Sequence, residues 1–301
     1  MIIVKMIGGI GNQLFQYAAA RSISYLKGVP IKVDTSFYDL KTDNRFFSLH
    51  HFNTIIIKAQ KEEIDKLIAK TSSSFYARIL KRFRFPTRFY KKTHIIENSK
   101  KVIDKRITNC NNDAFIEGWF QNEMYFKGIR DVLLKEFTLK NDERKEFQEA
   151  RNKIINCESV SIHFRRGDYL TNKYFGPAPL DYYYRAIKYI NERVILPVYY
   201  IFSDEIDWVK KNFKIEGNFH YLDSSRKNLS IHPTENDSQD LMLMKQCKYN
   251  IVANSTFSWW AAWLNTNPEK IIIAPKKWYD DPSAQKSFER GRLKVPGWIY
   301  L

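Results

Sequence analysis

The second half of the chain alternates short apolar runs with segments of helical spacing, and this alternation limits the possible fold more than any other feature. The runs are rich in β-branched and aromatic residues, which is typical of strands. Strands are expected over 160–164, 198–202, 219–222, 249–253 and 270–274, and helices over 181–193, 205–212, 238–247 and 257–264. Strands that alternate with helices predict a parallel sheet with helices on both faces.

The first half opens with the same pattern. A β-branched run over 2–7 leads into a glycine-rich turn, helical spacing follows over 12–26, and a second strand is expected over 31–34. A strand–helix–strand opening of this length implies parallel strands with a crossover helix. Residues 39–151 are less regular, and the elements expected there are a helix over 61–70, a strand over 115–120 and a polar helix over 141–156 that bridges two halves.

The chain is therefore expected to be α/β, with two Rossmann-like, doubly wound domains facing a cleft. We place the N-terminal domain at 1–150 and the C-terminal domain at 151–301, and we take 270–274 as the last strand. In open parallel sheets the ligand binds outside the carboxyl ends of the strands. Functional side chains should therefore directly follow strands.

Charge and cysteine usage narrow the function classes. Lysine and arginine number 49 against 33 acidic residues, a net charge of +16, which indicates nucleic acid, a phosphate-bearing metabolite or an acidic membrane surface as partner. Cys110, Cys157 and Cys247 form no C-x-x-C pair, so we expect reduced thiols in a soluble, cytoplasmic protein. Lys5 interrupts the apolar N-terminal run, which is too short for a membrane span and lacks the layout of a signal peptide.

The strongest chemical signal is the segment 161–169, Ser-Ile-His-Phe-Arg-Arg-Gly-Asp-Tyr. Alternate side chains of a strand share a face, so His163 and Arg165 should point together, away from the core. Arg165 and Arg166 then stand at the strand end, where planar guanidinium groups are suited to bind a pyrophosphate, and Asp168 can orient one of them. The alternative is a structural Arg–Asp ion pair at a sheet edge.

A second signal is the sequence Asn-Ser-Thr-Phe at residues 254–257, between an expected strand and an expected helix. Backbone N–H groups, hydroxyl groups and the positive end of the helix dipole form an anion site there. The alternative is ordinary helix capping by Asn254 or Ser255.

The opening turn is a third, weaker signal. It reads Gly-Gly-Ile-Gly-Asn-Gln over residues 8–13, and Leu14 stands where a dinucleotide-binding fingerprint has its third glycine. We therefore expect a glycine elbow whose backbone amides, with the side chains of Asn12 and Gln13, face a ligand other than NAD. The chain contains no P-loop, no H-E-x-x-H and no Asp-x-Asp motif, so neither an NTPase nor a metal site is expected.

The segment 75–90 interleaves arginines with aromatic residues. It suits stacking on bases or sugars, and equally a basic helix whose arginines face solvent or anionic lipid.

In this order, the three motifs at 8–17, 163–169 and 254–260 resemble those of the α-1,2-fucosyltransferases of glycosyltransferase family 11. The resemblance runs from Met1 to about Trp278. It implies a GT-B-like pair of α/β domains, GDP-L-fucose as donor, inversion at the anomeric carbon, and no metal or other cofactor.

The resemblance also assigns roles. Arg165 would bind the β-phosphate and stabilise departing GDP, with Arg166 and Asp168 in support. From the residues alone, the candidates for the base that deprotonates the acceptor hydroxyl are Asp168 and any acid of the N-terminal half, and a loose, cation-like transition state would need little base assistance. Asp240 resembles an acid that reads guanine. The donor-side residues implied are His163, Arg165, Arg166, Asp204, Asp240, Asn254, Ser255, Thr256 and Phe257. The residues expected on the acceptor side of the cleft are Gly9, Gly11, Asn12 and Gln13.

The implied acceptor is the 2-hydroxyl of a terminal β-galactoside in a bacterial surface polysaccharide such as O-antigen. Further expectations are a lipid-linked acceptor and peripheral contact with anionic lipid at the inner membrane face. Transfer to another linkage or acceptor is the nearest alternative. A basic nucleic-acid-binding protein would explain the charge, but the sequence has no recognition motif. A dinucleotide-dependent oxidoreductase would leave the motifs at 163–169 and 254–257 without roles.

Overall fold

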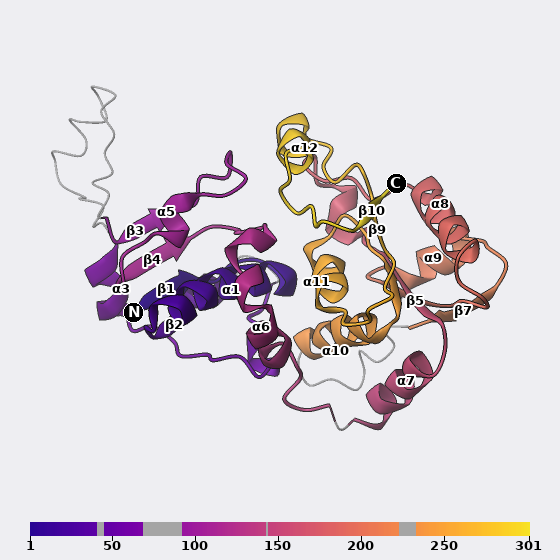
Figure 1. Ribbon diagram of the computed structural model, residues 1–301, viewed down its shortest axis with the longest axis horizontal. Coiled ribbons are helices and arrows are strands. Elements are labelled where there is room, and N and C mark those ends of the chain that lie inside the picture. Colours follow the sequence, from indigo (N-terminus) through magenta and orange to yellow (C-terminus); the bar gives the residue numbers. More distant parts are fainter. Residues whose placement is uncertain (41–44, 69–91, 143, 223–232) are drawn as a thin grey trace.

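The computed structural model describes residues 1–40, 45–68, 92–142, 144–222 and 233–301. In these ranges the chain forms two parallel sheets, one from strands β1 to β4 and one from β5 to β10, which stand beside each other in Figure 1. The expected pair of α/β units is thereby confirmed. The basic, aromatic segment 75–90 lies outside the described residues.

The first sheet has the strand order β2-β1-β4-β3, and every neighbouring pair is parallel. Its strands are β1 (Ile2–Lys5), β2 (Ile31–Asp34), β3 (His94–Ile96) and β4 (Ala114–Glu117). The described helices of this half are α1 (Ile10–Lys27), α2 (Ser36–Asp39), α3 (Lys61–Leu67), α5 (Lys105–Thr108) and α6 (Arg130–Glu136), with short 3-10 helices η1 (Leu49–His51), η2 (Glu123–Tyr125) and η3 (Lys127–Ile129). Val4 packs with residues of α1, whereas Ile3 packs with Leu67 of α3. Helices therefore cover both faces of the sheet.

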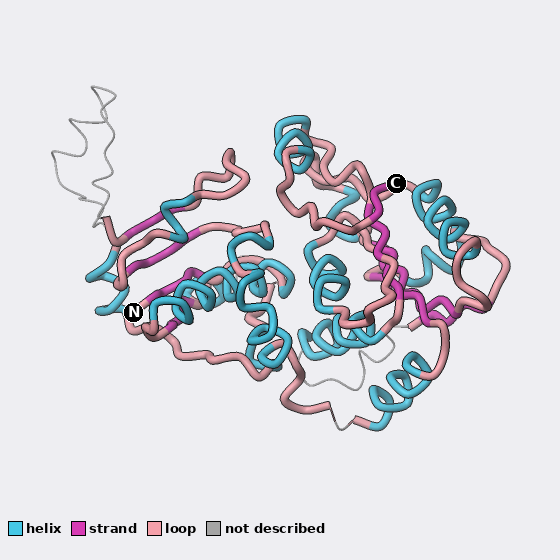
Figure 2. The backbone as a smooth tube through the Cα atoms, in the orientation of Figure 1, coloured by secondary structure: helices cyan, strands magenta, loops and turns pink. Residues whose placement is uncertain are grey.

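The second sheet has the order β10-β9-β8-β5-β6-β7, again with parallel neighbours throughout. Its strands are β5 (Ser159–Phe164), β6 (Val198–Ser203), β7 (Asn218–Tyr221), β8 (Tyr249–Ile251), β9 (Ile272–Ala274) and β10 (Ile299–Tyr300). The described helices of this half are α7 (Lys145–Ile155), α8 (Leu180–Asn191), α9 (Ile206–Asn212), α10 (Pro233–Gln246), α11 (Thr256–Leu264) and α12 (Pro282–Glu289), with the 3-10 helix η4 (Gly167–Leu170). Figure 2 shows helices on both sides of these strands.

Two expectations about the elements are wrong. The strand over 270–274 is not the last, because the two-residue β10 follows it at the sheet edge, and so short a strand leaves no periodicity to detect. The polar helix does not bridge the halves. It forms α7, which packs against α10 through the buried side chains of Phe147 and Ile154 and an ion pair between Arg144 and Glu235.

An aromatic cluster joins the two halves. The Phe15 ring of α1 lies 4.6 Å from the Trp259 ring and 4.9 Å from the Trp260 ring of α11, measured between ring centroids. Phe126 stacks on Trp260 at 5.1 Å, and Phe137 meets its edge at 5.3 Å. These five rings are buried in one hydrophobic cluster that contains residues of both sheets. The halves therefore share a core.

Among the described residues, no helix has both the length and the apolarity needed to cross a bilayer.

Candidate active site

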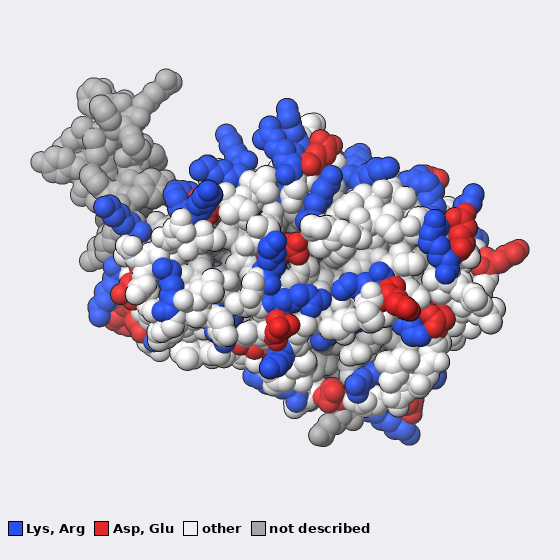
Figure 3. Space-filling model, viewed as in Figure 1, with Lys and Arg blue, Asp and Glu red and all other residues white. Residues whose placement is uncertain are grey.

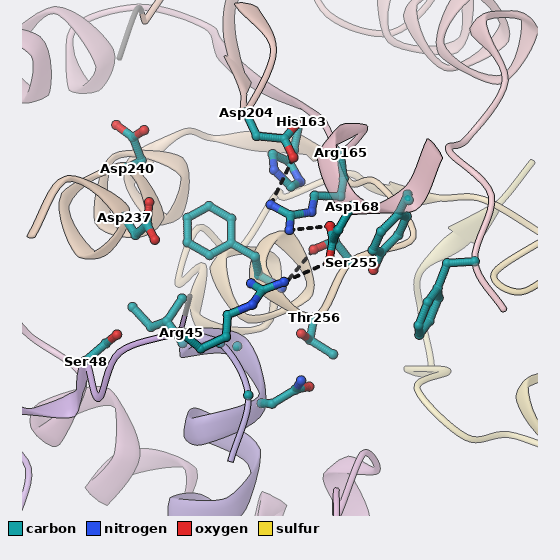
Figure 4. Close-up of a pocket in the computed structure, with 18 of the residues that line it drawn as sticks. Arg45, Ser48, His163, Arg165, Asp168, Asp204, Asp237, Asp240, Ser255 and Thr256 are labelled. Atoms are coloured by element: carbon teal, nitrogen blue, oxygen red, sulfur yellow. Dashed lines mark hydrogen bonds and ion pairs between the residues drawn. The ribbon is translucent and has the colours of Figure 1, made fainter. Parts of the chain in front are cut away.

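A cavity of about 480 Å³ lies between the halves, at the carboxyl ends of strands from both sheets. The first half contributes the turn after β1 and the loop before η1, and the second contributes the segments after β5, β6 and β8 together with one face of α10. Figure 4 shows part of this lining. Of the residues predicted from sequence, those that line the cavity are Gly9, Gly11, Asn12, His163, Arg165, Asp168, Asp204, Asp240, Ser255, Thr256 and Phe257.

Strand β5 places His163 as its alternation predicts. Ile162 and Phe164 pack in the core on one face of the sheet, while His163 lies on the other and shares a 3.0 Å hydrogen bond between its Nδ1 and the Ser258 hydroxyl. Burial, followed by the charge of Arg165, lowers the pKa of His163 to about 3. The imidazole is therefore neutral at physiological pH and forms a polar part of the cavity lining. Its ring centroid lies 5.4 Å from that of Phe257.

Arg165 directly follows β5, and two carboxylates hold it in the cavity (Figure 4). Its Nη1 lies 3.0 Å from Asp204 Oδ2, and its Nη2 lies 2.6 Å from Asp168 Oδ1. Burial alone would lower the pKa of Arg165, but Asp204 and Asp168 outweigh it, and the pKa is raised above its ordinary value. Gly167 permits this arrangement, because a Cβ there would lie 2.7 Å from Asp204 Oδ2. Arg165 is therefore a fixed positive charge.

Arg166 points away from the cavity, and a direct donor contact by its side chain is not supported. Its guanidinium carbon lies 3.2 Å from the centroid of the Trp208 ring, and its Nε donates to Glu205 at 2.9 Å. The backbone N–H of Arg166 donates to Asp204 Oδ1 at 3.0 Å. Arg166 therefore anchors the turn that presents Arg165, because alternate residues along the chain at the strand end face opposite ways.

The first turns of α1 and α11 meet at the cavity. A Cβ on Gly11 would lie 2.6 Å from Thr256 Oγ1 and 2.7 Å from the backbone nitrogen of Phe257, so only glycine permits this approach. Neither helix has an acidic residue in its first turn, and Ser255 caps α11 by accepting from the Phe257 N–H at 3.3 Å. Two positive helix ends therefore point at the same region, a favourable place for an anion.

Asn254 is structural. Its side-chain amide donates to the carbonyl oxygens of Gly176 and Trp278, at 2.7 and 2.9 Å, and it is absent from the cavity lining. The residue fixes two loops beside the site, and the predicted donor contact by its side chain is not supported.

Gln13 also differs from the prediction, because its side chain is fully buried. Its Nε2 donates to the carbonyl oxygens of Gly8 and Phe46 at 3.0 and 2.8 Å, and its Oε1 accepts from the Ser48 N–H at 2.8 Å. Gln13 therefore holds the loop before η1. Asn12 does line the cavity and accepts from Gln121 Nε2 at 3.0 Å.

Helix α10 presents Asp240 to the cavity, as expected, together with Asp237 one turn earlier (Figure 4). Asp237 was missed because α10 begins at Pro233, whereas the expected helix began at residue 238; in the longer helix its spacing of three residues places it beside Asp240. Arg45 was missed as well. It reaches the cavity from the first half, where its Nη2 lies 2.7 Å from Asp168 Oδ2, and it belongs to an irregular loop without a motif.

Aromatic side chains form another part of the lining that the sequence did not reveal. Tyr169 stacks on Phe175 with ring centroids 4.8 Å apart, and its hydroxyl donates to the Asn254 carbonyl at 3.2 Å. Burial, the largest cause, raises the pKa of Tyr169 to about 12. Tyr279 packs against Phe175 at 5.2 Å. These aromatic side chains form a neutral, apolar part of the cavity lining, whereas Arg45, Arg165 and the starts of α1 and α11 form a positively charged part.

The arrangement can bind a polyanion and stabilise negative charge that develops on it. Two guanidinium groups and two helix starts supply the positive charge. Asp168 and Asp204 pair with the guanidinium groups, and the carboxylates of α10 line another part of the cavity (Figure 4). Among the described residues, no group of three or more His, Cys, Asp or Glu side chains could hold a metal ion.

The known proteins similar to this chain are glycosyltransferases. The family profile described as Glycosyl transferase family 11 matches residues 1–301. The O-antigen biosynthesis glycosyltransferase WbnK of Escherichia coli is 31% identical, with 98% of each chain covered. An alpha-1,2-colitosyltransferase of Escherichia coli is 33% identical over 93% of each chain. Galactoside alpha-(1,2)-fucosyltransferase 2 of Sus scrofa is 28% identical over 58% of this chain and 52% of its own.

Solved structures show the same fold. The fucosyltransferase NodZ from Bradyrhizobium superposes with a TM-score of 0.55 over 90% of this chain and 94% of its own, at 13% sequence identity. The two sheets and the cleft between them form a GT-B-like fold, and the family profile makes the chain a glycosyltransferase. The chain belongs to glycosyltransferase family 11.

Proposed function

We propose that this enzyme transfers L-fucose from GDP-L-fucose to the 2-hydroxyl of a terminal β-galactoside, with inversion and formation of an α-1,2 linkage. The observation that carries the proposal is the position of Arg165, charged and fixed in a cavity where two helix starts converge. Fucosyl transfer places negative charge on the departing diphosphate, and preorganised cations and dipoles stabilise that charge most where it develops.

The donor has a natural orientation in the cavity. Its diphosphate lies at Arg165 and the first turn of α11, and its guanine extends toward Asp240 and Asp237 on α10. The nucleoside passes the β6 end at Asp204 and the His163 side of the lining. The support for this orientation is the position of Asp237 and Asp240, which line the cavity from α10 apart from Arg165 (Figure 4) and whose carboxylates can accept the N–H groups of guanine.

The acceptor sugar enters from the first half, beside Gly9, Gly11 and Asn12. The acceptor oxygen forms a bond to the fucose anomeric carbon as the bond from that carbon to the β-phosphate oxygen breaks, and the bonding electron pair leaves with GDP. The hydroxyl proton passes to a carboxylate, for which Asp168 is our candidate. Asp168 is 45% exposed at its side chain and lines the cavity that the acceptor must enter.

The transfer requires no metal ion in this proposal, since Arg165 and the helix starts supply the positive charge. EDTA should leave the initial rate unchanged. Loss of the rate in EDTA, with recovery on addition of Mg²⁺ or Mn²⁺, would contradict this part of the proposal.

The test is product analysis. GDP-L-fucose is offered with a panel of β-galactosides, and the products are examined by mass spectrometry and linkage analysis. A fucose 2-linked to galactose is the expected product. Fucose at another position, or hydrolysis without transfer to any galactoside, contradicts the proposed linkage.

The donor sugar has a second candidate, colitose, because one relative over 93% of the chain is named a colitosyltransferase. Colitose is L-fucose without its 3-hydroxyl group, so the two GDP-sugars differ by a single hydroxyl group. Rates with GDP-L-fucose and GDP-colitose at equal concentrations decide between them, and a preference for GDP-colitose would replace fucose in the proposal.

We further propose that the acceptor is a lipid-linked O-antigen intermediate, met at the cytoplasmic face of the inner membrane. The likeness to an O-antigen biosynthesis enzyme supports the acceptor class. Figure 3 shows basic side chains over both halves of one face, with acidic side chains between them, a distribution that suits diffuse attraction to an anionic surface better than a nucleic-acid track. Co-sedimentation with anionic vesicles, and none with neutral vesicles, is expected.

A further inference from the structure

The Asp168 carboxylate is held between two guanidinium groups that come from different halves of the molecule. Arg45 approaches from the first half, with its Nη2 2.7 Å from Oδ2, and Arg165 approaches from the second, with its Nη2 2.6 Å from Oδ1 (Figure 4). Arg45 and Arg165 are 120 residues apart in sequence, yet one carboxylate spans them. The three side chains form a bridge across the cavity.

Buried hydrogen bonds hold the loop that carries Arg45, so that its side chain reaches Asp168. The buried side-chain amide of Gln13 fixes the backbone of Phe46 and Ser48, which follow Arg45 closely. It forms one hydrogen bond of 2.8 Å with each of them. Gly9 leaves room beside the guanidinium, because a Cβ there would lie 3.1 Å from Arg45 Nη1. The loop is therefore held against the first turn of α1, and the arginine is directed into the cavity.

A carboxylate that accepts from two guanidinium groups, one contact from each, occupies a place that suits a phosphate, because guanidinium N–H groups bind carboxylate and phosphate oxygens alike. The first turns of α1 and α11 meet beside this bridge. A phosphate there would face two cations and two helix ends, whereas one carboxylate carries a single charge. The bridge is therefore a position where a diphosphate displaces the protein's own anion.

We infer that Arg45 is a second cation for the leaving diphosphate and that the donor's phosphate takes the place of the Asp168 carboxylate between Arg45 and Arg165. This inference rests on the proposed function and names a residue of the first half in the donor site. Donor binding then joins the two halves through phosphate. It also releases the Asp168 carboxylate from both guanidinium groups, on the side of the cavity where the acceptor enters.

The test compares ligands that differ only in phosphate. Binding of GDP and of guanosine is measured by calorimetry for the wild type, Arg45→Gln, Arg45→Lys and Asp168→Asn, with Arg193→Gln as a matched control. Arg193 lies after α8, paired with Glu192 and the Tyr189 ring. Arg45→Gln should weaken GDP binding about 10-fold or more and leave guanosine binding unchanged, and lysine should restore part of the loss.

The Asp168→Asn variant distinguishes a bridge that phosphate displaces from a bridge that is only structural. Removing the competing anion should strengthen GDP binding severalfold while turnover falls. Initial rates at saturating donor should fall about 100-fold in Arg45→Gln, in the range found when one transition-state donor is removed. GDP affinity within twofold of wild type in Arg45→Gln, or weaker GDP binding in Asp168→Asn, would overturn the inference. Failure of the wild type to bind GDP would instead overturn the proposed function itself.

Discussion

Asp204 keeps Arg165 in the cavity. One of its oxygens accepts from Arg165 and the other from the backbone N–H of Arg166, so this carboxylate couples the charged head of one residue to the main chain of the next. Partners of this kind determine the direction of a guanidinium and reduce the reorganisation needed when a ligand arrives. Arg165 is thus positioned before the donor binds.

Replacing Arg165 tests that role. Arg165→Gln should lower kcat/KM about 100- to 1,000-fold, because it removes a fixed charge that stabilises the leaving group, and Arg165→Lys should recover only part of the rate because it lacks the planar fork. Steady-state kinetics and a thermal melt are the measurements, with Arg193→Gln as control. Near-normal turnover in a folded Arg165→Gln enzyme would refute the assignment.

His163 predicts a pH effect on stability. Its pKa is about 3 in the folded chain and about 6.5 when unfolded, so below pH 6.5 the unfolded state binds a proton that the folded state does not. The favourable contribution is complete above pH 6.5 and is lost at about 1.4 kcal/mol per pH unit as the pH falls toward 3.

Urea unfolding of wild type and His163→Asn between pH 7 and pH 4.5 measures this contribution, since asparagine keeps a polar atom near the Nδ1 position. The wild-type free energy of unfolding should fall more steeply with decreasing pH than that of the variant. Parallel curves for the two proteins would show that His163 is not buried in its neutral form.

At the scale of elements, the contact between the first turns of α1 and α11 leaves no room for a side chain at Gly11. Gly11→Ala should destabilise the protein by about 1–3 kcal/mol, because the new Cβ meets Thr256 and the Phe257 backbone at 2.6–2.7 Å, and activity should fall as the helix ends separate. Gly128→Ala is the control, since a Cβ there has no neighbour within 4 Å. Chemical denaturation compares the two, and equal stability of both variants would contradict the close packing.

The elements that carry the motifs could be predicted because their signals are local. Strand β5 can be predicted from its β-branched residues and from the alternation that places His163 and Phe164 on opposite faces of the sheet. Arg45 could not be predicted, because its loop has no periodicity and its place depends on Gln13, a residue 32 positions earlier in the sequence. The contacts of the Arg166 side chain with Trp208 and Glu205 could not be predicted either, because they are set by tertiary packing.

At the scale of the whole molecule, the tryptophans of the motif at 254–260 serve the joint between the halves. Trp259 and Trp260 are fully buried against Phe15 of α1, directly behind the helix ends that line the cavity. The same short helix therefore forms part of the anion site at its start and part of the shared core along its length. A motif that the sequence associates with the donor is equally a packing motif.

A shared core predicts that the halves unfold together. Phe15→Ala should cost about 3–5 kcal/mol, and because Phe15 packs on α11 the loss should reach both sheets. Native-state hydrogen exchange should show protection falling by the same free energy in β1 and in β5. Leu26→Ala, at a position of the same helix that is 75% exposed, should change stability by less than about 0.5 kcal/mol. If protection in β1 falls while β5 is unaffected, the halves are independent folding units, and the aromatic joint is a contact between them and not a common core.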